Sequence, residues 1–313
     1  MAIRLKDIDL KATLPRIADS LPLFVVRSPS FEDRQHAIDQ FRKTLDLGRL
    51  QRVDVKESIH FVGDRGEIQY YRPSGGLWAM NHVASSAYED ERRPWKVVPK
   101  EHPEDPEYPE LTLEPDQQRG LSENALSLFR KAELTPEQSY FAGVDLEQVA
   151  QLDEKGTEVG RFAGEATIKF LYRTKATQCD GPGAKTYAFA NPGESEPQFT
   201  GFFHCWREIQ DARELRMVRT EEALERGVAR DRELDVYQMK GYRFRLTEVD
   251  LVYHTMPPFC HQEYVFPTLH VVGSAISPEA PLESFEFTRY YNAADPSSYI
   301  EAGLCALYLN CRP

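Results

Sequence analysis

The sequence predicts an α+β protein built from two tandem units, each a helix packed on an antiparallel β-sheet. Three observations lead to this prediction. Apolar residues recur at helical spacing in a short segment near the start of each unit. Runs with strand-like alternation, joined by turn residues, follow each of these segments. The order of elements in the first unit is repeated in the second. A helix lying across a sheet buries the apolar face of both, so each unit can have its own core.

The first unit comprises residues 1–94. Its helix is expected to begin after Ser30, because Ser30 is a favourable cap and Asp33 follows at the third helical position. The apolar stripe of this helix runs from Ala37 to Leu45, and Gly48 ends it. The strands expected in this unit are 21–28, 52–62, 67–72 and 75–81, with a hairpin turn at 63–66.

Residues 95–115 are expected to form an extended connector between the units. Prolines at this density exclude a helix or a central strand, because proline lacks the N–H that either requires. The domain boundary is therefore predicted here. The prolines are Pro99, Pro103, Pro106, Pro109 and Pro115.

The second unit comprises residues 116–283. Ser122 is expected to cap its first helix and Thr220 to open its second. A stretch rich in Gly and Pro, residues 177–198, is predicted to be a loop. The strands expected are 144–152, 165–173, 199–209, 242–254 and 263–276.

The last segment, residues 284–313, is predicted to be an apolar tail with a strand near its start. Residues 298–309 are apolar enough to need a covering surface. The tail is expected to dock on the body of the protein or to form a contact between two copies, which would make the protein a homodimer.

Charge and composition limit the classes of partner. The net charge of −12 and the absence of basic clusters argue against nucleic acid or an anionic membrane as the main partner. The beginning of the sequence carries no apolar run typical of a signal peptide, and no run is long enough to span a membrane. Five widely spaced cysteines are typical of free thiols in a reducing compartment. The expectation is an acidic cytoplasmic protein that binds a small molecule.

Three sequence stretches resemble a known group of proteins. These are LPLFVVRSPS (21–30), YYRPSGGLWAMN (70–81) and VDLVYHTMPP…EYVFPTLHVVG (249–273). Their pattern is similar to the PepSY-like group that includes the YycH and YycI regulatory proteins. The resemblance implies tandem cystatin-like α+β units, each with a helix on a curved antiparallel sheet. It also implies a regulatory module outside the cytoplasm behind a membrane anchor, yet this sequence shows neither signal nor anchor.

Strand alternation in the second unit divides side chains between a core face and an open face. If the more apolar face packs under the helices, the other face collects titratable and aromatic side chains. A solvated sheet face or a contact between domains would explain the same pattern. The candidate catalytic residues on this face are His204, Glu248, Asp250, His254 and His270, and the candidate substrate-binding residues are Lys169, Arg173, Phe202, Trp206, Tyr264 and Phe266.

No spacing in the sequence is typical of a metal or cofactor site, so none is expected. The histidines lack the short spacing of zinc ligands, and nucleotide-binding glycine motifs are absent. Gly181-Pro182-Gly183 lacks the strand–helix frame of a phosphate loop and is expected to be a connector. Cys260 and His261 are adjacent, which favours opposite directions on a strand unless both lie in a turn.

Two functions of different classes follow. The first is a cofactor-independent isomerase, lyase or cyclase, of the kind found in natural-product biosynthesis. It would act on a small apolar substrate with His and carboxylate side chains as proton donors and acceptors. The second is a non-catalytic PepSY-like binding or regulatory module that uses the same face as a protein or peptide contact. An enclosed cavity would favour the enzyme, and a flat apolar patch would favour the module.

Overall fold

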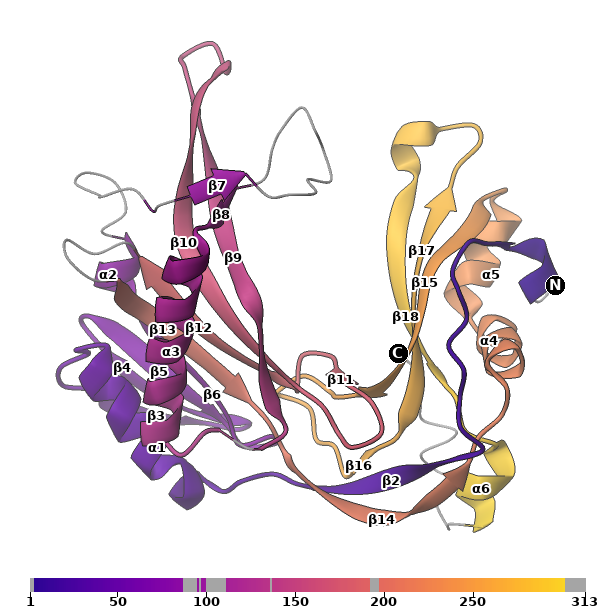
Figure 1. Ribbon diagram of the computed structural model, residues 1–313, viewed down its shortest axis with the longest axis horizontal. Helices are drawn as coiled ribbons and strands as arrows, with labels where there is room; N and C mark the ends of the chain where they lie inside the picture. The colour runs from indigo at the N-terminus through magenta and orange to yellow at the C-terminus, as the bar shows by residue number, and fades with distance from the viewer. Residues whose placement is uncertain are drawn as a thin grey trace.

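The computed structural model describes residues 3–86, 95, 97–99, 111–135, 137–191 and 197–301. These residues form a U in which two arms rise from a common base, each arm a sheet with helices against one face (Figure 1). The predicted α+β class, with helices packed on open antiparallel sheets, is confirmed. Over the described residues, no helix has both the length and the apolar character needed to cross a bilayer.

The first arm is an eight-stranded antiparallel sheet in the order β3-β4-β5-β6-β13-β12-β10-β9. Helices α1 and α3 pack on one face of it. Phe41 of α1 stacks on Phe202 of β13 with ring centroids 4.8 Å apart, and Phe129 of α3 meets the same ring at 5.7 Å. The elements of this arm are α1 (Phe31–Thr44), β3 (Gln51–Val55), β4 (Ser58–Gly63), β5 (Gly66–Tyr71), β6 (Gly76–Asn81), α2 (His82–Ser86), β7 (Val97–Pro99), β8 (Leu111–Leu113), α3 (Pro115–Lys131), β9 (Ser139–Leu152), β10 (Glu158–Tyr172), β12 (Lys185–Asn191) and β13 (Gln198–Cys205).

The two longer helices of this arm, α1 and α3, differ in how well the sequence predicts their starts. At α1, Asp33 N–H donates to Ser30 Oγ and Ser30 N–H donates to Asp33 Oδ2, which is the predicted capping box. The prediction that Ser122 caps α3 is wrong. This helix begins at Pro115, whose fixed φ and missing N–H suit a first turn. Ser122 lies inside the helix, where its hydroxyl donates to the carbonyl of Arg119.

The second arm is a sheet in the order β1-β15-β17-β18, with the short β11 paired to the same edge of β15 as β1. Helices α4 and α5 cover one face, where Leu224 of α4 and Leu234 of α5 are buried with Leu269 of β17. The opposite face looks toward the first arm (Figure 1). The elements are η1 (Leu5–Asp7), β1 (Asp9–Leu10), β11 (Cys179–Asp180), α4 (Thr220–Val228), α5 (Arg232–Met239), β15 (Arg243–His254), β17 (Pro267–Ile276), η2 (Pro281–Glu283) and β18 (Phe285–Asn292).

The base is a three-stranded sheet in the order β14-β2-β16. It comprises β2 (Ser20–Arg27), β14 (Glu208–Arg216) and β16 (Tyr264–Val265), and α6 (Pro296–Glu301) packs against it. Tyr299 of α6 is fully buried with Leu23 and Leu215. The rest of the predicted tail, residues 302–313, lies outside the described residues.

The sheets do not follow the predicted division at 95–115. Strand β6, which precedes this segment, pairs with β13, which follows it. Without β13, the edge of β6 would leave a row of backbone N–H and C=O groups without partners. In addition, the predicted loop 177–198 contains β11 and β12, and the predicted strand 263–276 is divided at Phe266 between the base and the second arm.

Candidate functional site

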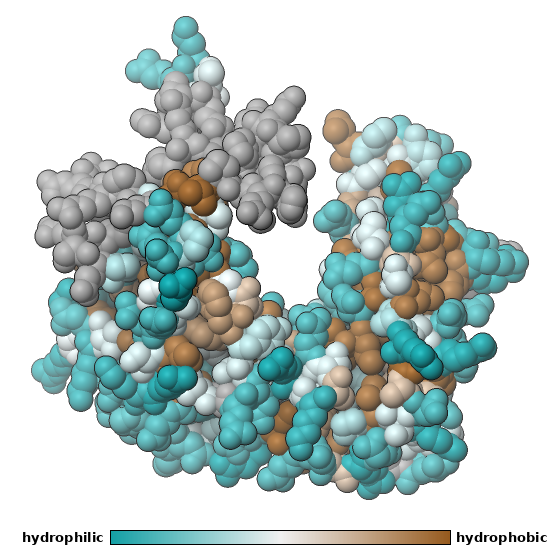
Figure 2. All heavy atoms as spheres, viewed as in Figure 1, coloured by the Kyte–Doolittle hydropathy of each residue, from teal (hydrophilic) through white to brown (hydrophobic). Residues whose placement is uncertain are grey.

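A cleft lies between the two arms, and Figure 2 shows it as a deep hollow in the surface. One wall is the face of β15, β17 and β18 that lies opposite α4 and α5. The other wall includes Tyr187, which faces Lys169 and Phe203 on the neighbouring strands. Burial raises the pKa of Tyr187, and the charges of Asp145 and Asp180 raise it further. Asp180 belongs to the second arm, so a charge of that arm acts on a side chain of the first arm.

Tyr290 of β18 is the centre of a cluster of titratable side chains on the wall that β15, β17 and β18 form. Its ring lies between His254 and His270, with centroid distances of 3.9 Å and 5.2 Å. Its hydroxyl donates to Asp180 Oδ2 over 2.8 Å. His270 Nε2 lies 3.9 Å from the same carboxylate oxygen, an ion-pair distance rather than a hydrogen bond. The cluster therefore joins β11, β15, β17 and β18.

The pKa shifts of Asp180 and Tyr290 define the polarity of their hydrogen bond. Burial alone would raise the pKa of Asp180, but hydrogen bonds from the Tyr290 hydroxyl and the Gly181 N–H, together with the charge of His270, lower it. Burial raises the pKa of Tyr290, and the contact with Asp180 raises it further. At neutral pH, Tyr290 is therefore a protonated donor and Asp180 an ionised acceptor.

Two more carboxylates adjoin His270. Asp250 lies directly opposite His270 in the β15–β17 register. A hydrogen bond with Asp250 raises the pKa of Glu248, as does burial. One ligand-type atom from each of Glu248, Asp250 and His270 lies within 4.8 Å of the others. Among the described residues, these three side chains form a group of the kind that can bind a metal ion. Their spacing in the sequence did not predict a metal site.

His254 is held in a dry environment. Its Nδ1 is buried and has no hydrogen-bond partner among the described residues. Gly181 packs so closely that a Cβ there would lie 2.9 Å from this nitrogen and 2.4 Å from the carbonyl oxygen of Thr255. Burial lowers the pKa of His254 to about 4, so the imidazole is neutral at pH 7. The turn at Gly181 is thus a tightly packed connector that covers Nδ1 of His254.

The low pKa of His254 makes the fold sensitive to acid. Below pH 6.5 a histidine in the unfolded chain becomes protonated, whereas His254 in the fold stays neutral until about pH 4. The unfolded state therefore binds more protons, and stability falls as the pH decreases through this window. We expect His254 to account for a loss of about 2 kcal/mol between pH 7 and pH 5, measured by urea denaturation at both values.

A variant comparison isolates this effect from other titrating groups. His254→Asn should show a smaller loss of stability between the two pH values than the wild type. His261→Asn is the control, because the His261 side chain is 72% exposed. Equal losses in the wild type and in His254→Asn would contradict the assignment.

His204, predicted to be catalytic, does not belong to this cluster. It lies on β13 in the first arm, is 1% exposed, and its Nδ1 is 2.8 Å from Thr186 Oγ1. Burial, followed by the charge of Arg34, lowers its pKa well below the ordinary value. A neutral imidazole enclosed in a core cannot contact a substrate in the cleft. The prediction for His204 is wrong.

The four aromatic residues predicted to bind substrate also pack elsewhere. Phe202 is in the core of the first arm, and Trp206 stacks on Tyr172 at 4.2 Å under the base. Tyr264 and Phe266 pack beside Leu23 and Tyr299 in the base. Phe202 and His204 lie on the buried face of β13, which was predicted to be the open face, and Trp206 follows the strand, which ends at Cys205. Strand β16 ends before Phe266 and β17 begins after it in another sheet, so Tyr264 and His270 do not share a sheet.

The two predicted basic residues have separate surroundings. Lys169 on β10 forms an ion pair with Asp145 on the first wall. Arg173 is exposed at the end of β10, and its guanidinium lies 5.7 Å from the ring centroid of Tyr140. Arg173 lines a surface pocket in the loop that leads to β11. Of these two residues, Arg173 is the one close in sequence to Asp180.

Cys260 and His261 do not form a thiol–base pair. The turn that contains Cys260 wraps around the buried guanidinium of Arg207, which donates to the carbonyl oxygens of Met256, Pro257 and Cys260 at 3.0, 3.1 and 2.7 Å. His261 is directed toward Glu263, with Nε2 4.0 Å from Oε1. Arg207 thus fixes the turn at the end of β15 and supports the position of His254.

Asp180 and Tyr290 are the residues that sequence reasoning missed. Tyr290 had a signal: alternation along 285–292 puts it on the face opposite Phe287, which is buried under the helices. Asp180 had no comparable signal, because a two-residue strand inside a stretch rich in Gly and Pro carries no periodicity.

Comparison with known proteins shows a likeness in fold alone. No protein-family model matches the sequence, and no curated protein matches it either. Among solved structures, the chain is similar to an uncharacterized protein from Eubacterium rectale ATCC 33656, with a TM-score of 0.50 and 9% sequence identity. The match covers 90% of this chain and 86% of that one. The PepSY-like resemblance stays a prediction.

Proposed function

We propose that the protein is an acid–base enzyme that acts on a small organic substrate bound in the cleft, as an isomerase, lyase or cyclase. The observation that carries this proposal is the contact among Tyr290, Asp180 and His270 on the cleft wall. A titratable side chain held by a second group, which is itself held by a third, is the arrangement that general acid–base catalysis requires.

In this proposal His270 exchanges the proton with the substrate. Its imidazole removes a proton from a carbon beside a carbonyl group and returns it at another carbon of the same molecule. The ionised Asp180 stabilises the imidazolium that forms, and the Tyr290 hydroxyl fixes the direction of the carboxylate. Across the cleft, Tyr187 and Phe203 are half-buried and offer aromatic surface for an apolar substrate body.

Deuterium exchange tests the proposal without a known substrate. The protein is incubated in D2O with a panel of small ketones, enones and their carboxylated or phosphorylated derivatives, and each compound is analysed by mass spectrometry. We expect a protein-dependent gain of deuterium for at least one compound class. His270→Gln should abolish this gain, whereas His261→Gln should keep it. Equal exchange with the wild type and with His270→Gln would contradict the assignment.

A second candidate function is a non-catalytic binding module. The observation in its favour is that the pocket beside the cluster opens to solvent and is not enclosed. A protein or peptide segment would then occupy the cleft between the arms. Ligand binding without any deuterium exchange across the panel would favour this function over the enzyme.

A further inference from the structure

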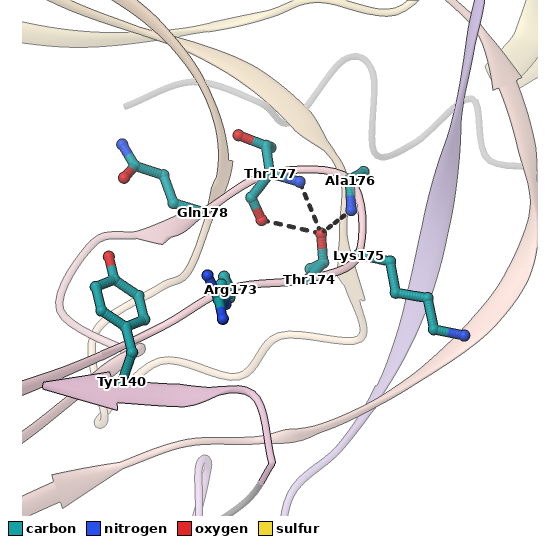
Figure 3. Close-up of a pocket in the computed structure, with 7 residues that line it drawn as sticks. All are labelled: Tyr140, Arg173, Thr174, Lys175, Ala176, Thr177 and Gln178. Atoms are coloured by element: carbon teal, nitrogen blue, oxygen red, sulfur yellow. Dashed lines mark hydrogen bonds between the residues drawn. The ribbon is translucent and has the colours of Figure 1, made fainter.

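A pocket of about 620 Å³ lies in the loop between β10 and β11 (Figure 3). Its volume is within the range of small-molecule sites. The loop runs from the end of β10 directly into Asp180, so the pocket adjoins the titratable cluster along the chain. The lining residues are Tyr140, Arg173, Thr174, Lys175, Ala176, Thr177 and Gln178.

Hydrogen bonds hold this loop in one conformation. Thr174 Oγ1 accepts from the backbone N–H groups of Ala176 and Thr177, as the dashed lines in Figure 3 show. Thr177 Oγ1 donates to the carbonyl of Leu251 over 2.9 Å, and the N–H of Tyr253 donates to the carbonyl of Gln178. The loop is therefore fastened to the edge of β15, and binding in the pocket requires little ordering of the backbone.

The charge of the pocket favours an anion. Arg173 and Lys175 are its charged lining residues, and none of the described residues that line it is acidic. Both of these side chains are exposed. The guanidinium of Arg173 lies against the ring of Tyr140, which limits its orientation. A local positive site in a chain of net charge −12 is expected to bind a carboxylate or phosphate group.

Alternation along 178–180 relates one residue of the pocket to one residue of the cluster. Gln178 lines the pocket, and Asp180 follows it two positions later. In extended chain, residues two apart point to the same face and are about 7 Å apart. Cys179, between them, is buried on the opposite face. A molecule whose anionic group lies in the pocket would thus place its adjoining atoms beside Asp180 and His270.

We propose that this pocket binds the anionic group of the substrate, which makes the substrate a small organic acid or phosphate ester. This proposal rests on the proposed function for the reaction, but it is a separate claim about binding. Arg173 would bind the anion through its fork of N–H donors, and Lys175 would add a flexible second charge. The apolar part of the substrate would extend from the pocket toward the aromatic wall.

Binding of two simple probes tests the pocket. Benzoate represents a carboxylate and phenyl phosphate a phosphate ester, and both are titrated by isothermal calorimetry and by saturation-transfer NMR. We expect millimolar or tighter binding of at least one probe, weakened by added salt. The double variant Arg173→Ala/Lys175→Ala should weaken it about tenfold or more. The double variant Arg42→Ala/Lys43→Ala makes the same change of charge on the exposed surface of α1 and should leave the affinity unchanged.

The outcomes separate the two proposals. Preference for one probe identifies the anionic group as carboxylate or phosphate and upholds the pocket. Absence of binding, or equal loss in both double variants, overturns it. If probe binding requires Arg173 and Lys175, the proposal of an anion-binding pocket is upheld. If the same protein exchanges no deuterium with any compound, the proposed enzymatic function is contradicted. Exchange that is insensitive to both residues upholds the enzyme and overturns the pocket.

Discussion

Asp180→Asn is expected to slow catalysed deuterium exchange by about 10²–10⁴-fold while the fold is retained. The carboxylate of Asp180 is the group that accepts from Tyr290 and lies 3.9 Å from His270. The amide of asparagine has the same shape and keeps the packing, but it is neutral and cannot stabilise the imidazolium of His270. The substitution therefore raises the energy of the charged transition state. The measurement is the initial rate of exchange at saturating substrate, with circular dichroism as a check on folding.

Two further variants show whether the loss comes from this contact. Tyr290→Phe removes the hydroxyl but keeps the ring between the two histidines, so we expect a smaller loss of about tenfold. Asp9→Asn removes a carboxylate that pairs with Arg245 at the other end of β15, and the rate should not change. If Asp180→Asn and Asp9→Asn have equal rates, Asp180 has no part in catalysis.

Features of the fold that depend on local sequence were predictable. The capping box at Ser30 and Asp33 involves residues three apart, and the helix that follows it was placed correctly. The hairpin between β4 and β5 was likewise visible from its turn residues. These elements form because neighbouring residues specify them, whatever packs on them later.

Pairing between distant strands was not predictable in the same way. The pairing of β6 with β13 joins residues such as Trp78 and Phe203, and nothing local to either strand identifies the other. The prolines of 95–115 predicted an extended connector, yet Pro99 lies in β7 and Pro115 begins α3. They do not show whether the sheet resumes on the far side of it, because an extended segment can connect strands of one sheet as well as two domains.

The candidate site was predicted in part, for a physical reason. His254, His270, Asp250 and Glu248 lie on two adjacent antiparallel strands, so strand alternation alone places them on one face. Alternation does not say which face is covered when both are apolar. On β13, Phe202 and Phe203 are equally hydrophobic, and only the position of α1 and α3 decides which is buried.

Phe202→Ala is expected to lower the free energy of unfolding by about 3–5 kcal/mol. The ring is completely buried and contacts Phe41, Phe129 and Phe199 at centroid distances of 4.8, 5.7 and 5.4 Å. Removing it leaves a cavity between α1, α3 and the sheet, and three surrounding aromatic rings are too rigid to fill it. Urea denaturation followed by tryptophan fluorescence measures the change.

Phe203→Ala is the matched control, because it removes the same side chain from the next residue on the opposite face. Phe203 is only partly buried and lies opposite Tyr187 and Trp78 on the first wall of the cleft, so we expect a loss of about 1 kcal/mol. Under the proposed function, Phe203→Ala should weaken binding of an apolar substrate, and Phe202→Ala should not once the protein is folded. Similar losses of stability for both variants would contradict the assignment of faces on β13. The aromatic wall opposite His270 would then need to be assigned again, because it depends on Phe203, and not Phe202, facing the cleft.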